Sequence, residues 1–107
     1  MIYEIVLTLK AQEQLEATHD WWARHRSGEQ AASWYNGFAD AIVKLAENPQ
    51  RWPRSTEARA FPYEIRELHF GLHDRPTHRA VFTIRERLIV VLAIRHLAQS
   101  AITADDV

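Results

Sequence analysis

The sequence predicts an α+β domain: an N-terminal strand, an antiparallel hairpin of two helices, and then a three-stranded antiparallel sheet. Two observations predict it. Residues 9–45 repeat apolar side chains at helical spacing, and residues 63–96 contain three runs rich in β-branched and aromatic residues. A chain of 107 residues has room for one hydrophobic core. We therefore expect a single domain over residues 1–98, followed by a C-terminal tail at residues 99–107.

The first strand and the first helix are predicted at the N-terminus. Residues 2–7, IYEIVL, have the composition of a strand, which we expect to join the same sheet as the later strands. Thr8 can cap the helix that follows. The stretch HRSGEQ interrupts the helical pattern, and Gly28 is expected to end the helix. The residues expected on its inward face are Ala11, Leu15, Thr18 and Trp22.

The second predicted helix has the clearest pattern in the chain. Ser27 and Gln30 have the spacing of a capping box at its start, and Asn48-Pro49 stops it. Its apolar and aromatic stripe could form a cofactor surface, but core packing explains the stripe better, and we expect no cofactor. The stripe consists of Ala31, Trp34, Tyr35, Phe38, Ile42 and Leu45.

A loop and three strands are predicted in the C-terminal half. Residues 49–62 lack periodicity and should form a loop that Trp52 orders in part, and the strands follow at residues 63–70, 78–84 and 88–96. If residues 85–87 form a three-residue turn, Ile84 faces Leu88 and one face of the last hairpin is wholly apolar. The face expected to pack on the helices carries Ala80, Phe82, Ile84, Leu88, Val90, Leu92 and Ile94. The opposite face carries Arg79, Val81, Thr83, Ile89, Val91, Ala93 and Arg95.

This register places two arginines at the open end of the hairpin, on the face turned away from the helices. Arg79 faces Ala93 and lies diagonal to Arg95, so an anion, a carboxylate or water must separate the two cations. They could bind an anionic ligand there, together with Arg66 of the preceding strand. His96 is expected to point to the other side of the sheet.

Structural roles for the same residues stay open. Arg79 could form a salt bridge with Glu64 or Glu67 of the neighbouring strand. Arg95 could pair with the carboxylates of Asp105-Asp106 or of the C-terminus. His96 could be an ordinary histidine at a strand end.

The amino-acid composition limits the kinds of site that the chain can form. The chain has no cysteine, which excludes disulfides and thiolate chemistry, and His69, His73 and His78 lack the one-face spacing of metal ligands, so we expect no metal site. No signal peptide or membrane helix is apparent, and we expect a cytoplasmic protein that does not bind membranes. Residues 51–96 hold nine arginines and five acidic residues, so an anionic partner is plausible there.

The predicted order of elements comes with three stretches, LAENPQRWP, HRAVFTI and VVLAIRH. Together these features resemble the RelE/ParE superfamily of toxins from type II toxin–antitoxin modules. Members of this superfamily are often described as plasmid stabilisation proteins. The resemblance covers about residues 2–98. It implies a RelE/ParE-like fold, inhibition of growth, and a cognate antitoxin as partner. Trp21 cannot point inward as fully as its neighbour Trp22, and it is the first candidate for an antitoxin contact. The alternative is that Trp21 covers the rim of the helix hairpin.

The resemblance implies two alternative activities. RelE-like members cut messenger RNA on the ribosome by attack of a ribose 2′-hydroxyl on the adjacent phosphate. Arg79 would then bind the phosphate, Arg95 would be a second phosphate ligand, His96 would be the acid or base, and Glu57 is a weaker candidate for the base. ParE-like members bind DNA gyrase and need only a contact surface, for which Arg66, Arg79 and Arg95 are the candidate target-binding residues.

The gyrase alternative is favoured by what the sequence lacks. The tail LAQSAITADDV contains no Tyr or Lys, residues 48–62 contain no Lys, and the net charge is −1. Many ribosome-dependent members carry such residues in these places, and a protein that binds RNA phosphates gains from excess positive charge. An interaction module without toxicity is the third alternative.

Overall fold

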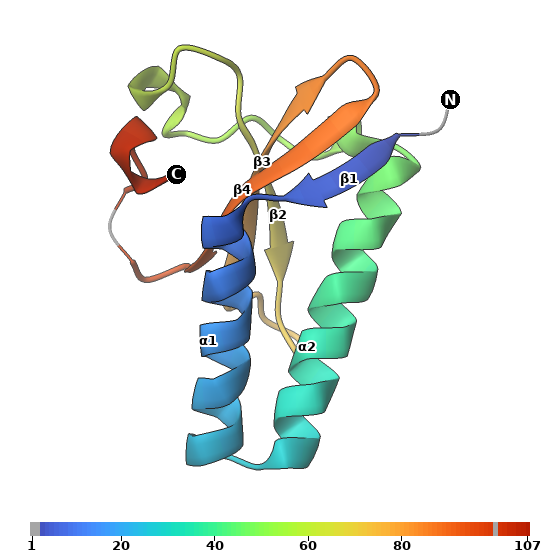
Figure 1. The fold of residues 1–107 in the computed structure, drawn as a ribbon, viewed down its shortest axis with the longest axis vertical. Coiled ribbons are helices and arrows are strands. Elements are labelled where there is room, and N and C mark those ends of the chain that lie inside the picture. The colour runs from blue at the N-terminus through green and yellow to red at the C-terminus, as the bar shows by residue number, and fades with distance from the viewer. Residues whose placement is uncertain (1–2, 100) are drawn as a thin grey trace.

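The computed structural model describes residues 3–99 and 101–107, so Ile2 of the predicted first strand and Ser100 of the tail lie outside the described residues. The strands form one sheet in the order β1-β4-β3-β2, and the two long helices form a hairpin (Figure 1). The elements are β1 (Glu4–Leu7), α1 (Leu9–His25), α2 (Gly28–Val43), β2 (Arg66–Phe70), β3 (His78–Arg85) and β4 (Leu88–His96), with short 3₁₀ helices η1 (Lys44–Ala46), η2 (Pro49–Arg51), η3 (Ala58–Ala60) and η4 (Ala104–Asp106).

The predicted α+β class is confirmed, and the sheet is mixed. Strands β2, β3 and β4 are antiparallel as predicted, but β1 runs parallel to β4, with Glu4 opposite Leu88. The Glu4 amide donates a hydrogen bond to the Arg87 carbonyl at 2.8 Å. A parallel pair needs a long crossover connection, which the helical hairpin and the strands β2 and β3 provide here.

Side-chain caps set the helix starts. The Thr8 hydroxyl accepts a hydrogen bond from the Ala11 amide at 3.1 Å, and the Ser27 hydroxyl accepts one from the Gln30 amide at 3.0 Å. The prediction that Gly28 ends the first helix is wrong. Because Ser27 is the N-cap, Gly28 is already the first residue of α2.

The hairpin of β3 and β4 departs from the predicted register. Its turn contains only two residues, with Glu86 in the left-handed region at φ 55°, so Ile84 lies opposite Ile89 instead of Leu88. A bulge then restores the original parity: Phe82 lies opposite Val91 while Val81 lies opposite Ala93, which leaves Leu92 as the extra residue.

The bulge divides β4 into two parts. In the part beyond the bulge, Ile94 faces the helices as predicted. In the part between the turn and the bulge, the residues predicted to face the helices face away from them, and their neighbours face the helices instead. Ile89 and Val91 pack in the core beneath the helices, whereas Leu92 packs on the far side and Val90 lies against that second cluster. A one-residue change of register moves every following side chain to the opposite face of the sheet, until a second irregularity shifts the register by one more residue.

Both faces of the sheet are therefore covered. The larger core lies between the sheet and the helices and is centred on Trp34, Phe38 and Phe82. The loop before β2 and the C-terminal tail cover the other face, and Figure 1 shows these two segments next to each other. The second cluster consists of Phe61, Ile65, Val81, Leu92, Ala93 and Ile102. The face that the sequence suggested as open to a ligand is thus largely filled by the chain itself.

Candidate functional site

The arginine pair lies at the open end of the hairpin, but it is buried. Arg79 lies directly opposite Arg95, where the sequence predicted a diagonal placement, and the two residues are 5% and 8% exposed. The Arg79 guanidinium binds Glu67 at 2.8 Å and Glu57 at 3.1 Å. The structural alternative that paired Arg79 with Glu67 is confirmed, and Glu57 is a second partner from the preceding loop.

These carboxylates belong to a wider hydrogen-bonded network. Ser55 donates a hydrogen bond to Glu67, and the ring of His69 contacts the other carboxylate oxygen at 3.0 Å. Burial by itself would raise the pKa of Glu67, but these hydrogen bonds and the charge of Arg79 outweigh burial and lower it. Glu57 accepts a hydrogen bond from the Ile102 amide at 2.8 Å. The network therefore ties together β2, β3, the loop and the tail.

Arg95 lies beside the C-terminal tail. A hydrogen bond from the Thr103 backbone lowers the pKa of Asp106, and the positive charge of Arg95 contributes to the same shift. This proximity agrees with the predicted structural alternative for Arg95.

Arg66 does not join the other two arginines. It lies opposite Phe82, which places it on the helix-facing side of the sheet. Its guanidinium binds Glu64 at 2.8 Å and donates hydrogen bonds to the carbonyl groups of Gln50 and Trp52. These contacts fasten the loop to β2.

His96 lies on the opposite side of the sheet from the arginine pair. It pairs with His78 across the hairpin, and the two imidazole rings are 4.9 Å apart. The Ala98 amide donates a hydrogen bond to His96 Nδ1 at 3.0 Å, so a neutral His96 carries its proton on Nε2. The structure therefore does not bring Arg79, Arg95 and His96 together in one site.

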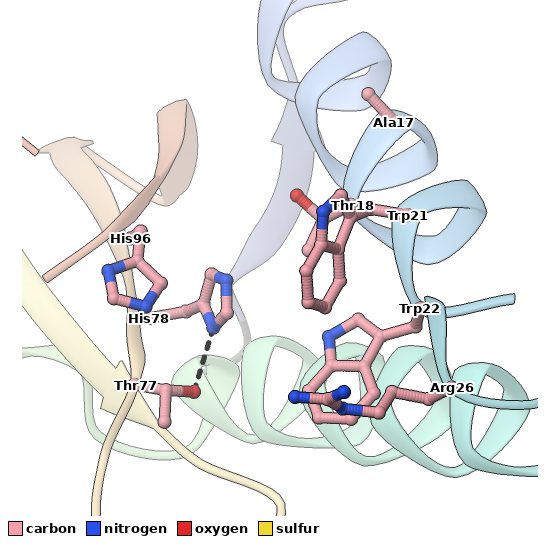
Figure 2. Close-up of a pocket in the computed structure, with 8 residues that line it drawn as sticks. All are labelled: Ala17, Thr18, Trp21, Trp22, Arg26, Thr77, His78 and His96. Atoms are coloured by element: carbon pink, nitrogen blue, oxygen red, sulfur yellow. Dashed lines mark hydrogen bonds between the residues drawn. The ribbon is translucent and has the colours of Figure 1, made fainter. Parts of the chain in front are cut away.

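A pocket of about 480 Å³ opens on this histidine side, between the sheet and the second half of α1. Figure 2 shows the rings of His78 and His96 facing Trp21 and Trp22 across the opening. Trp21, the predicted antitoxin contact, is 42% exposed at the rim. The pocket is lined by Ala17, Thr18, Trp21, Trp22, Arg26, Thr77, His78 and His96.

In the sequence, His78 was considered only as a metal ligand, and it was not expected in this site. Burial and the neighbouring His96 lower its pKa to about 4, so the ring is neutral near pH 7. Its ring also contacts the buried indole of Trp34, with centroids 5.1 Å apart. The sequence did contain a signal for this position: His78 alternates with Ala80 and Phe82, which face the helices, so it is expected on the same side of the sheet.

Within residues 3–99 and 101–107, no group of three or more His, Asp or Glu side chains is arranged to hold a metal ion. In the same part of the chain, no helix has the length and apolar character that crossing a bilayer requires.

A helical hairpin on one face of a four-stranded sheet, in this order of elements, is the arrangement expected of the RelE/ParE fold. Residues 5–101 match the family model described as the ParE toxin of the type II toxin–antitoxin system parDE, and the chain belongs to this family.

Solved structures agree on the fold. The chain is similar to one described as the chromosomal ParDE TA system from P. aeruginosa, with a TM-score of 0.72 and 21% sequence identity. The alignment covers 89% of this chain and 96% of that one. No curated protein sequence matches the chain.

Proposed function

We propose that this chain is the toxin of a type II toxin–antitoxin module, that it inhibits growth by acting on DNA gyrase in the cytoplasm, and that a cognate antitoxin neutralises it. The observation that carries the proposal is the separation of the candidate nuclease groups. Arg79 is buried against two carboxylates on one face of the sheet, and His96 lies on the other. Membership of the ParE toxin family supports the same activity.

The charges around Arg79 support a protein-binding activity over phosphate chemistry. The Arg79 guanidinium already binds the carboxylates of Glu57 and Glu67. A phosphate would meet two carboxylates already bound to the cation it needs. Gyrase inhibition through a contact surface requires neither a free phosphate-binding cation nor a paired acid and base.

A gyrase cleavage assay tests the proposal. Purified protein is titrated into gyrase, supercoiled plasmid and ATP, with a reaction lacking gyrase as the control. Linear DNA should accumulate with dose only when gyrase is present.

Intact, normally supercoiled DNA at all doses would overturn the gyrase proposal. The next assay would then look for cleavage of messenger RNA in the ribosomal A site. Loss of such cleavage in a folded His96→Ala protein would favour the nuclease alternative.

A further inference from the structure

The pocket between α1 and the β3–β4 hairpin is open and has apolar walls. Its volume of about 480 Å³ lies within the range of pockets that hold ligands. On one side, His78 is neutral near pH 7 because its pKa is lowered to about 4, so its ring adds little charge to the wall. On the other side stand the indoles of Trp21 and Trp22, as Figure 2 shows. These surroundings suit a large apolar side chain.

Trp21 is held in place at the rim although it is 42% exposed. Its ring stacks on His25 with centroids 4.6 Å apart, and it is nearly perpendicular to the ring of Trp22, with centroids 5.9 Å apart. The Arg26 guanidinium lies 5.7 Å from the same ring. An exposed indole that its neighbours already orient loses little conformational freedom on binding, which favours its use as an interface anchor.

The charge of the pocket is positive. Arg26 is the one permanently charged residue among its lining residues, and no lining residue is acidic. Arg54, Arg66 and Arg79 all form ion pairs with glutamates. Within residues 3–99 and 101–107, by contrast, no carboxylate lies within salt-bridge distance of Arg26. A cation at the edge of an apolar pocket complements a carboxylate next to an apolar side chain.

We infer that this pocket binds a peptide segment of a partner protein in which a large apolar side chain lies next to an acidic residue. The apolar side chain enters between the two indoles and His78, and the carboxylate pairs with Arg26. The inference rests on the proposed function in one respect, because it takes the partner to be the antitoxin. It adds the residues that recognise the antitoxin and the chemistry of the segment recognised.

Two short peptides test the pairing. The probes are Ac-Leu-Phe-Glu-NH₂ and Ac-Leu-Phe-Gln-NH₂, which differ in one charge. Binding is followed at pH 7 through the NMR signals of the four tryptophan indole N–H groups, of which Trp21 and Trp22 should shift. Because Arg26 is exposed, the charged peptide should bind about threefold more tightly than the neutral one.

Arg26→Gln should make the two affinities equal, whereas Arg24→Gln, an exposed position of the same helix outside the pocket, should keep the ratio. Trp21→Ala should weaken both peptides by about tenfold or more. The spectrum of each variant reports whether it is folded.

Three outcomes would overturn the inference. These are an Arg26→Gln protein that keeps the threefold preference, equal shifts of all four indoles, and Trp21 and Trp22 signals that move with protein concentration without peptide. The last result would mean that a second copy of the chain fills the pocket. Peptide binding and the gyrase assay are measured separately, so a negative gyrase result leaves the peptide result to be judged by itself.

Discussion

Replacement of Arg79 by methionine should destabilise the protein more than any change at an exposed arginine. Arg79 is 5% exposed, and its removal would leave the side chains of Glu67 and Glu57, which are 10% and 19% exposed, without their cation. Breaking a buried ion pair from one side costs about 3–5 kcal/mol. This is a large part of the roughly 5–15 kcal/mol that holds a typical domain folded.

Urea unfolding followed by tryptophan fluorescence measures this effect. The midpoint of Arg79→Met should fall by about 2 M, given slopes of roughly 1–3 kcal/mol per molar urea. Arg85→Met is the matched control, because Arg85 lies at the exposed end of the same strand and should cost less than about 1 kcal/mol. The double variant Arg79→Met/Glu67→Gln should recover part of the loss, because it removes one of the two unpaired carboxylates.

Equal midpoints for Arg79→Met and Arg85→Met would refute the structural role given to Arg79. If such a stable Arg79→Met protein also failed to convert plasmid DNA to the linear form with gyrase, the arginine would belong to the target-binding surface, as the sequence first suggested.

The remaining predictions concern pH, the hairpin turn and a helix cap. The pKa of His78 is lowered from 6.5 to about 4 in the folded protein. As the pH falls, the unfolded chain therefore takes up a proton before the folded protein does, and stability decreases. Urea unfolding should show the free energy of unfolding falling by about 2 kcal/mol between pH 7.5 and 5. His78→Phe should reduce this slope and His73→Gln, in the exposed loop, should keep it. Glu86→Asn should raise stability by about 0.5–1 kcal/mol in the same assay, because Asn tolerates the left-handed turn position, and an unchanged midpoint would count against strain there. Thr8→Ala should cost about 1 kcal/mol, since the hydroxyl caps α1, and a neutral result would contradict that role.

The helices were predictable because their signals are local. Apolar spacing and the hydroxyl groups of Thr8 and Ser27 are readable over a few neighbouring residues, and the structure places both caps as expected. The far side of the sheet was not predictable in this way. The residues that cover it, such as Phe61 and Ile102, come from segments without periodicity, and their docking depends on contacts distant in sequence.

The candidate site was predictable only in part for the same reason. Opposite positions on a hairpin follow from alternation, which placed Arg79 and Arg95 on one face and His96 on the other. Alternation cannot show that Glu57 reaches Arg79 from a loop. Nor can it show that a two-residue turn exchanges the faces of half of β4 before the bulge at Leu92 restores them. Those features depend on contacts between segments that are far apart in the sequence.

The parallel pairing of β1 with β4 has a consequence for synthesis on the ribosome. Glu4 pairs with Leu88, which is synthesised 84 residues later. At about 5–20 residues per second, the partner of the first strand is therefore made roughly 4–17 s after it. During that interval the helical hairpin has no completed sheet to cover its apolar stripe. A premature stop codon anywhere before the end of β4 should therefore abolish the fold.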